Sequence, residues 1–244
     1  GTTLANGLVG HWTFDGPDVT TTVTDRSGQN NHGYFNGGAT SSAKVIGKLG
    51  QALNFDGSSN FVDVPVTASL DVTTGVSVSA WFKADTTAGN RRILSVPGNE
   101  TNGDEKYALM LSSGELSFWI GTDSDQRTST AFTDTSNWHN AVGTWDDATD
   151  AFILYLDGIA VHTSSKSATI TDNTVGNLQI GRYGPTFGQY FDGKIDHARV
   201  YNRALSPAEV KQLYQLGTVR ITQPTTLTLG TQVRIGKTIL ELRK

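Results

Sequence analysis

The sequence predicts an all-β protein, a two-sheet antiparallel jelly-roll sandwich with one short C-terminal helix and an extra β-rich tail. Short runs of β-branched and aromatic residues recur between clusters of Gly, Asn, Asp and Ser, a spacing typical of sandwiches and jelly rolls. The 27 glycines among 244 residues and a charged fraction of 17% also fit a β-protein with many turns. The predicted strands are residues 75–84, 106–111, 115–121, 140–145, 152–157, 177–182 and 193–201.

Period-two alternation indicates which face of a strand enters the core. Three of the runs alternate clearly between apolar side chains and polar or bulky aromatic ones. Their predicted core faces are Val76, Val78, Ala80 and Phe82; Leu116, Phe118 and Ile120; and Phe152, Leu154 and Leu156. Asp157 and Gly158 follow the third run and predict a tight hairpin turn, because both residues tolerate positive φ.

One helix is predicted near the C-terminus. Ser206 is the expected N-cap, Pro207 the first helical residue, and Glu209 completes a capping box. Gly217 is expected to end the helix. So short a helix depends on docking an apolar stripe against the rest of the protein. The stripe consists of Val210, Leu213 and Tyr214.

Composition changes after Gly217, which predicts a jelly roll over 1–217 and a basic β-rich tail, or the start of a following module, over 218–244. The tail carries five bases and one acid, a net charge of +4, so residues 1–217 carry −8. Alternation in 225–229 and 238–242 predicts extra strands. Whether the tail docks on the jelly roll or pairs with another copy stays open.

Charge and composition exclude several classes of protein. A net charge of −4 argues against a nucleic-acid partner, which would need a basic stripe. No apolar run approaches the roughly 20 residues of a membrane helix, so membrane insertion is not expected. The absence of cysteine removes disulfides and favours a bacterial source over a eukaryotic secreted one. Because the chain begins at Gly1 rather than Met, we expect a mature or excised fragment.

The order of motifs resembles laminin-G-like and pentraxin-like jelly rolls of the concanavalin A-like lectin/glucanase superfamily. The resemblance covers nearly all of residues 7–217 and is specific for the fold, but the fold hosts lectins, glycosidases, lyases and adhesion modules alike. The matching segments are GLVGHWTFDG (7–16), DRSGQNNHG (25–33), GQALNFDGSSNFVDVP (50–65), VSVSAWFKAD (76–85), WHNAVGTWD (138–146), ILYLDGIAV (153–161), LQIGRY (178–183) and FDGKIDHARVYNRALSPAEVKQLY (191–214).

The resemblance implies a structural Ca²⁺ ion, with Asp15 and Asp196 as its carboxylate ligands. The loop 28–32 would add main-chain carbonyls, up to that of His32, or the Asn30 side chain. Calcium takes six to eight oxygen ligands, which such loops can supply. The alternative is that Asp15 and Asp25 simply cap turns. Calcium-mediated ligand binding of the pentraxin kind is not expected, because the stretch after residue 183 has no carboxylate before Asp192.

Catalytic machinery is not evident, and the enzyme question is left uncertain, leaning towards no enzyme. A retaining glycosidase needs two carboxyl groups roughly 5–5.5 Å apart, and no strand carries such a pair. The acidic runs 103–106 and 123–125 are expected to be solvated loops. His139 could act as a base in a lyase, with Tyr155, Lys83 or Arg127, but a framework histidine is the preferred interpretation.

A glycan site needs flat aromatic faces beside polar groups, and the sequence offers two candidates. The first is the loop 182–190 at the rim of the sandwich, with Tyr183, Phe187 and Tyr190 among glycines. The second is the outer face of the central sheet, with Trp81, Trp119 and Tyr155 beside Ser77, Ser79, Ser117 and Lys83. The alternative for the second is that loops cover these aromatic residues in a second small core.

The function expected from all this is a calcium-stabilised carbohydrate-binding or adhesion module of a larger secreted or cell-surface protein, with a glycan or cell-surface ligand. A glycan-cleaving enzyme, hydrolase or lyase, is the first alternative. A structural or protein-interaction spacer that assembles through the basic tail is the second.

Overall fold

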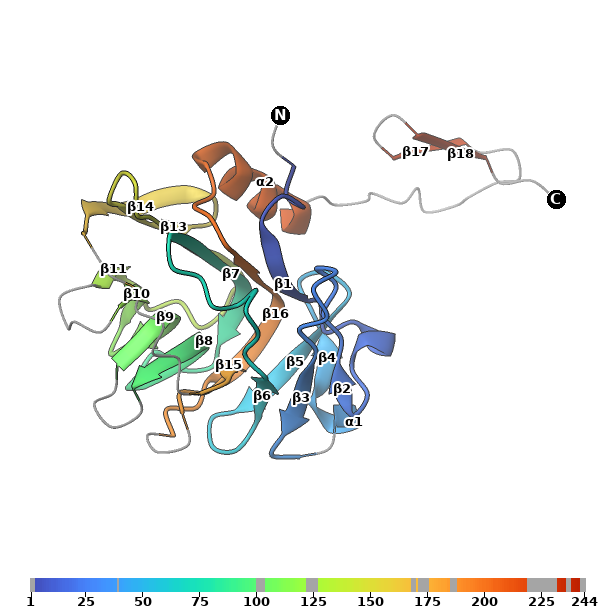
Figure 1. Cartoon of the computed structure of the whole chain (residues 1–244). Helices are drawn as coiled ribbons and strands as arrows, with labels where there is room; N and C mark the ends of the chain where they lie inside the picture. Colours follow the sequence, from blue (N-terminus) through green and yellow to red (C-terminus); the bar gives the residue numbers. More distant parts are fainter. Residues whose placement is uncertain are drawn as a thin grey trace.

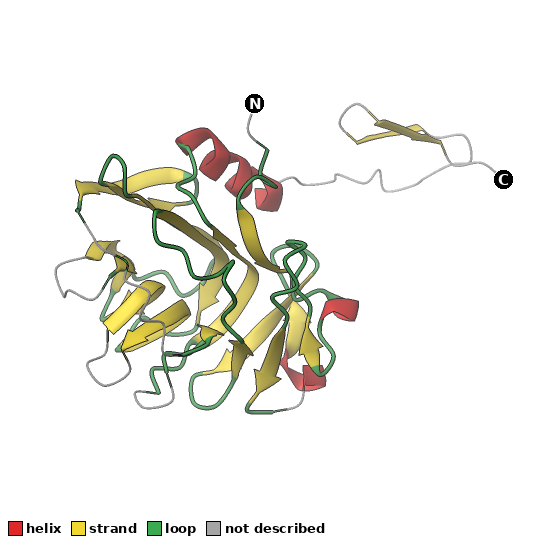
Figure 2. Ribbon diagram, viewed as in Figure 1, coloured by secondary structure: helices red, strands yellow, loops and turns green. Residues whose placement is uncertain are grey.

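The computed structural model describes residues 3–38, 40–99, 104–121, 127–167, 170, 176–184, 188–218, 232–235 and 238–241. Two eight-stranded antiparallel sheets pack face to face (Figures 1 and 2), as the sequence predicts. Sheet A has the order β14-β13-β12-β7-β16-β5-β4, and β1 pairs with β16. Its strands are β1 (Leu8–Trp12), β4 (Lys44–Ile46), β5 (Gln51–Asp56), β7 (Gly75–Ala84), β12 (His139–Asp146), β13 (Ala151–Leu156), β14 (Ile159–Ser165) and β16 (Asp192–Tyr201).

Sheet B has the order β11-β10-β9-β8-β15-β6-β3-β2. Its strands are β2 (Thr22–Val23), β3 (Gly33–Asn36), β6 (Phe61–Val64), β8 (Asn90–Asn99), β9 (Asp104–Ser112), β10 (Glu115–Ile120), β11 (Arg127–Ala131) and β15 (Leu178–Ile180). A 3₁₀ turn (Gly16–Asp18) and a one-turn helix α1 (Thr40–Ala43) lie between strands of the N-terminal part.

The main core lies between the two sheets, and the alternation of the strands predicted it correctly. The inward residues of β7, β10 and β13 all belong to this core, with Leu156 packed at its margin. The Phe118 and Phe152 rings lie 5.2 Å apart across the sheets. Gly143 faces Phe118, and a side chain at this position would overlap the ring. The small residue therefore lets the sheets approach closely at this point.

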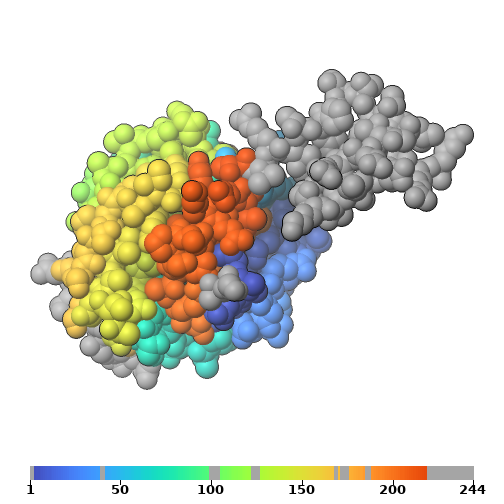
Figure 3. Space-filling model, turned by 90° about the horizontal axis from the view of Figure 1, so that it is seen from above, coloured from blue at the N-terminus to red at the C-terminus, as the bar shows by residue number. Residues whose placement is uncertain are grey.

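The helix α2 (Pro207–Thr218) covers the outer face of sheet A. Its Val210 and Leu213 complete a second cluster with residues of that face, and Tyr214 stacks on Trp81 at 5.6 Å between ring centroids. Gly217 lies against the Trp81 indole, where a side chain would overlap it. Figure 3 shows α2 in orange between the yellow β13–β14 region and the blue N-terminal segment. The second cluster also contains Val142, Tyr155, Tyr201 and Leu205.

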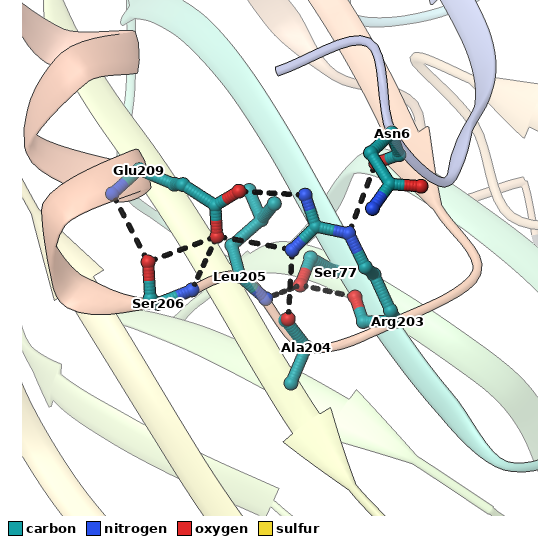
Figure 4. Close-up of polar contacts among 7 residues, drawn as sticks. All are labelled: Asn6, Ser77, Arg203, Ala204, Leu205, Ser206 and Glu209. Carbon is teal, nitrogen blue, oxygen red and sulfur yellow. Dashed lines mark hydrogen bonds and ion pairs between the residues drawn. The ribbon is translucent and has the colours of Figure 1, made fainter. Parts of the chain in front are cut away.

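A compact set of polar contacts fixes the start of α2 (Figure 4). Ser206 and Glu209 form the predicted capping box, in which the Ser206 main-chain N–H donates to Glu209 Oε2 at 2.9 Å. Arg203 binds the same carboxylate with two nitrogens, at 2.7 and 3.0 Å. The Ser77 hydroxyl of β7 accepts the Leu205 N–H and donates to the Arg203 carbonyl. The helix continues one residue beyond the expected end at Gly217.

All seven predicted strands are present as β7, β9, β10, β12, β13, β15 and β16, with ends shifted by up to two residues. Asp157 and Gly158 both have positive φ, as expected of the hairpin turn. In the tail, β18 (Thr238–Glu241) matches a predicted strand, whereas β17 (Gln232–Ile235) was not predicted, and 225–229 lies outside the described residues. β17 and β18 pair with each other. No helix of the described part is long and apolar enough to span a bilayer.

Replacing Glu209 by Ala should lower the free energy of unfolding by about 2–4 kcal/mol, because it leaves the Arg203 guanidinium and the helix start without their acceptor in a largely buried place. Chemical denaturation followed by tryptophan fluorescence measures the loss. Gln212→Ala, at an exposed position of the same helix, should change it by less than about 0.5 kcal/mol. Equal losses in the two variants would contradict this role of Glu209.

Candidate functional site

One row of side chains crosses the whole outer face of sheet B. Cross-strand partners share a face of a sheet, so the pairing register aligns one outward residue from each strand, next to the inward core residues. We call this set the outer row. Its members, from β2 to β11, are Thr22, Tyr34, Asp63, Gln179, Ser95, Ala108, Trp119 and Arg127.

Hydrogen bonds hold the polar part of the outer row in place. Asp63 accepts from the Asn177 amide at 2.6 Å and from the Gln179 amide at 3.2 Å. Gln179 in turn accepts from Arg182 Nε at 3.1 Å, and the Ser95 hydroxyl donates to the Arg182 carbonyl at 3.0 Å. Gln179 and Ser95 are buried, whereas Asp63 and Arg182 are half-buried. The network thus presents fixed polar groups at the surface.

Aromatic rings flank this network. The Arg182 guanidinium lies 3.8 Å above the Phe61 ring centroid, and the Tyr190 ring lies 6.3 Å from Phe61. On the other side of the row, Trp119 is half-buried, and its indole N–H donates to the Gly121 carbonyl at 3.2 Å. Tyr34 is 53% exposed. The face therefore combines flat apolar rings with positioned hydrogen-bonding groups.

A buried ion pair lies beneath the loop that follows β15. Arg92 donates to Glu105 through Nε at 2.6 Å and Nη2 at 3.2 Å, and its guanidinium lies 5.0 Å from the Tyr183 ring centroid. Burial raises the pKa of Glu105, and the Arg92 charge opposes this rise. The expectation that 103–106 is a solvated loop is wrong for Glu105 and Lys106, which are buried in β9; 123–125 lies outside the described residues.

The prediction that Trp81, Trp119 and Tyr155 share one open face is wrong. Trp81 and Tyr155 belong to sheet A, where α2 buries them to 1% and 2% exposure, as the alternative of a second small core had it. Trp119 belongs to β10 of sheet B, on the opposite side of the sandwich. The physical reason is that large apolar side chains on the outer face of sheet A are stabilised by an apolar cover.

The other predicted aromatic site lies beside the outer row. Tyr183 is 1% exposed and its ring packs over Arg92, so this ring supports the loop instead of facing solvent. Tyr190 is half-buried and contacts Phe61 and Arg182. Phe187 lies outside the described residues. The structure therefore brings Tyr190 and Trp119 to the same face of sheet B, although the sequence placed them at two different sites.

Sequence reasoning missed several residues of this face: Tyr34, Phe61, Asp63 and Gln179. A usable signal existed for two of them. Asp63 alternates with Val62 and Val64, and Gln179 alternates with Leu178 and Ile180, which marks both as outward-facing.

The two predicted calcium carboxylates border one turn, residues 47–51 between β4 and β5. Asp15 Oδ1 accepts the Gln51 N–H at 2.8 Å, and Asp196 Oδ2 accepts the Leu49 N–H at 2.9 Å. The second oxygen of Asp196 lies 2.8 Å from His197 Nδ1. Asp196 is fully buried. Both residues thus organise the turn, and two carboxylates beside it are hard oxygen ligands of the kind calcium takes.

His32 makes its hydrogen bond at another place, next to Asp25. The loop 28–32 closes around Asp25, whose carboxylate accepts the Asn31 and Ser27 N–H groups. His32 Nδ1 accepts the Asp25 N–H at 3.0 Å, and Asn30 is exposed with positive φ. No described contact joins Asn30 or His32 to Asp15 or Asp196. Among the described residues, no group of three or more His, Cys, Asp or Glu side chains is placed to hold a metal ion.

Both ring nitrogens of His139 contact carboxylates of the framework. Its Nδ1 lies 2.8 Å from Asp157 Oδ2 and its Nε2 lies 3.2 Å from Asp134 Oδ2. The hydrogen bond to Asp157 raises the pKa of His139 above its ordinary value of 6.5, burial opposes the rise, and Asp134 adds to it. With both ring nitrogens facing carboxylates, the geometry fits a framework residue.

These features define a jelly-roll β-sandwich domain with a helix over one sheet and an aromatic, polar face on the other. The profile of the concanavalin A-like lectin/glucanases superfamily matches residues 56–211. The chain belongs to this superfamily. No curated protein matches the sequence significantly.

Solved structures show the same fold at low identity. Domain 4 of AbnA, an extracellular GH43 arabinanase from Geobacillus stearothermophilus solved with arabinotriose, aligns with a TM-score of 0.64 and 20% identity over 85% of this chain and 98% of that domain. The binding domain of Paraclostridial Mosquitocidal Protein 1 aligns at 0.65 and 15%, over 87% and 52%. That of botulinum neurotoxin DC, bound to rat synaptotagmin II, aligns at 0.62 and 14%, over 88% and 52%. The chain spans about half of these two toxin domains.

The stability supplied by His139 should fall as the pH rises. Its pKa is higher in the folded than in the unfolded chain, so the contribution is fully present below pH 6.5 and is lost as the pH rises through the folded pKa. Urea denaturation should show that the free energy of unfolding is lower at pH 8 than at pH 6. This decline should be smaller in His139→Gln than in the parent protein. If both proteins lost the same free energy between these pH values, His139 would not be the group responsible.

Proposed function

We propose that this chain is a carbohydrate-binding module of a larger extracellular protein and that it takes an extended glycan across the outer face of sheet B. The observation that carries the proposal is the outer row. It places exposed or half-buried Tyr34, Trp119 and Arg127 on one sheet face with Asp63 and its hydrogen-bonding partners.

The chemistry of this face suits a sugar. Aromatic rings pack on the apolar face of a pyranose or furanose ring, and fixed amide, carboxylate and guanidinium groups hydrogen-bond its hydroxyls. Tyr34 and Trp119 are five strand spacings apart in sheet B, or roughly 24 Å at about 4.8 Å per spacing. This length suits several linked sugar units in preference to a single monosaccharide.

Two neighbours in fold support the proposal. Domain 4 of AbnA was solved in complex with arabinotriose, and it belongs to a multidomain extracellular enzyme. A botulinum neurotoxin DC binding domain was solved in complex with SialylT. These ligands define the first probes, arabino-oligosaccharides and sialylated oligosaccharides, together with a panel of insoluble polysaccharides.

Replacing Trp119 by Ala should weaken glycan binding by about 5–30-fold, because a half-buried aromatic anchor on a binding face contributes about 1–2 kcal/mol. Affinity gel electrophoresis and isothermal titration calorimetry against the retained glycan measure the effect. Tyr34→Ala, at the other end of the row, should have a smaller effect because Tyr34 is the more exposed of the two rings.

Ile159→Ala is the matched control, because Ile159 is 69% exposed on β14 of sheet A, and it should bind like the parent protein. Wild-type affinity in both Trp119→Ala and Tyr34→Ala would refute the site. Retention on no glycan would favour a protein-interaction or spacer role, and release of soluble product would favour a glycan-cleaving enzyme.

The proposal includes a structural calcium ion at Asp15 and Asp196. What supports it is their position on either side of the turn 47–51 and the lack of a hydrogen bond to Asp15 Oδ2 among the described contacts. Bound calcium would tie the N-terminal segment and β16 to this turn. The proposed site does not include His32, whose Nδ1 accepts the Asp25 N–H, or Asn30 of the same loop.

Calcium should therefore raise the melting temperature relative to a chelator, with each tenfold increase in free calcium above the Kd adding about 1.4 kcal/mol of stability. Asp15→Asn keeps an acceptor for the Gln51 N–H but removes the charge, and it should abolish the calcium response. Asp147→Asn, at an exposed position of the β12–β13 turn, should keep it. Identical melting curves with calcium and chelator would exclude this ion.

A further inference from the structure

The outer face of sheet A carries a polar row next to the apolar cluster under α2. In the pairing register, His11 of β1 lies opposite Arg199 of β16, Arg199 opposite Ser79 of β7, and Ser79 opposite Val142 of β12. Val142 packs in the cluster under α2. Because cross-strand partners share a face, His11, Arg199 and Ser79 lie on that same side of sheet A, away from the outer row of sheet B.

Arg199 is a buried charge that forms no ion pair with a carboxylate in the described part of the chain. It is 6% exposed, and its guanidinium makes one described hydrogen bond, from Nη1 to the His197 carbonyl at 3.3 Å. No Asp or Glu of the described residues forms an ion pair with it. The neighbouring Asp196 already accepts the Leu49 N–H and faces His197 Nδ1. Burial lowers the pKa of Arg199, but a guanidinium stays protonated in proteins, so its desolvation calls for a negative partner.

Three further polar atoms around Arg199 are buried and have no hydrogen-bond partner among the residues that the structure describes. They are Ser79 Oγ, Tyr201 Oη and His11 Nε2. Ser79 and Tyr201 have no exposed surface. Tyr201 follows Arg199 by two positions on β16, so its side chain points to the same face, and its ring packs in the cluster under α2. Two hydroxyls and an imidazole from three strands can all donate hydrogen bonds here.

We propose that Arg199, with the hydroxyls of Ser79 and Tyr201 and the imidazole of His11, binds a small inorganic anion of the size of chloride on the outer face of sheet A. An anion supplies the negative charge that a water molecule lacks, and it can accept hydrogen bonds from all four groups at once. Because these groups are buried, the ligand has to shed its hydration shell, which favours a compact ion over the acid group of a polysaccharide. The site is independent of glycan binding, since it lies on the other sheet.

The test compares thermal unfolding of the whole chain in sodium chloride and in sodium gluconate at equal ionic strength and pH. At a chloride concentration ten times the Kd, the melting temperature should be about 3 °C higher than in gluconate. A crystal grown in bromide and measured at the bromine absorption edge should show an anomalous peak beside Arg199.

The double variant Ser79→Ala, Tyr201→Phe keeps Arg199 and removes two donors with little change in volume. In gluconate the double variant should be at least as stable as the parent protein. In chloride its melting temperature should no longer rise above the value in gluconate. Tyr155→Phe removes another buried hydroxyl on the same face and should keep the rise in melting temperature that chloride causes. Equal melting temperatures of the parent protein in chloride and gluconate, with no bromine peak, would overturn the proposal and assign these groups to bound water.

Discussion

Sheet A has to be buried on both faces, and this constraint decides where the rest of the molecule goes. Its inner face packs on sheet B, while its outer face carries Trp81, Tyr155 and Tyr201. A 12-residue helix is marginal alone, so α2 and the apolar side chains beneath it stabilise each other, with Arg203 and Glu209 fixing the angle at which the helix starts. Because α2 covers sheet A, the aromatic and polar side chains that stay exposed or half-buried on a sheet face, such as Tyr34, Asp63 and Trp119, lie on the outer face of sheet B.

The sequence predicted the elements well and their assembly less well, for a physical reason. Alternation and capping are local, so the inward residues of β7 and β10 and the start of α2 could be identified directly. The sheet to which a strand belongs depends on partners far away in the chain. Trp81 and Trp119 both occupy outward positions in alternating strands, yet β7 pairs with β12 and β16, whereas β10 pairs with β9 and β11. Nothing local distinguishes the two tryptophans.

The candidate site could be predicted from the sequence only in part, for the same reason. The outer row gathers Asp63, Gln179 and Trp119 from distant segments through antiparallel register. Taken alone, each of these residues gives only the sequence pattern of an ordinary outward-facing side chain. The loop 28–32 shows the converse: it contains the oxygen-rich residues expected of a calcium loop, yet its main chain closes around the nearby Asp25. A local hydrogen-bonded turn fixes this loop, and its contacts do not extend to Asp15 or Asp196.

Each sheet contains a buried guanidinium, and the two differ in whether a carboxylate pairs with it. This difference bears on the roles that we propose for the two sheets. In sheet B, Arg92 is neutralised by Glu105 of the adjacent strand. The charge is satisfied within the chain, and the pair becomes a rigid support beneath Tyr183 and the surface where we place the glycan. In sheet A, no carboxylate of the described residues forms an ion pair with Arg199, although the surrounding side chains are as well packed. Both arginines lose water on folding, and our anion proposal accounts for how the charge of Arg199 is offset. The structure thus separates a preorganised open face, suited to exchangeable ligands, from a closed one suited to a resident ion.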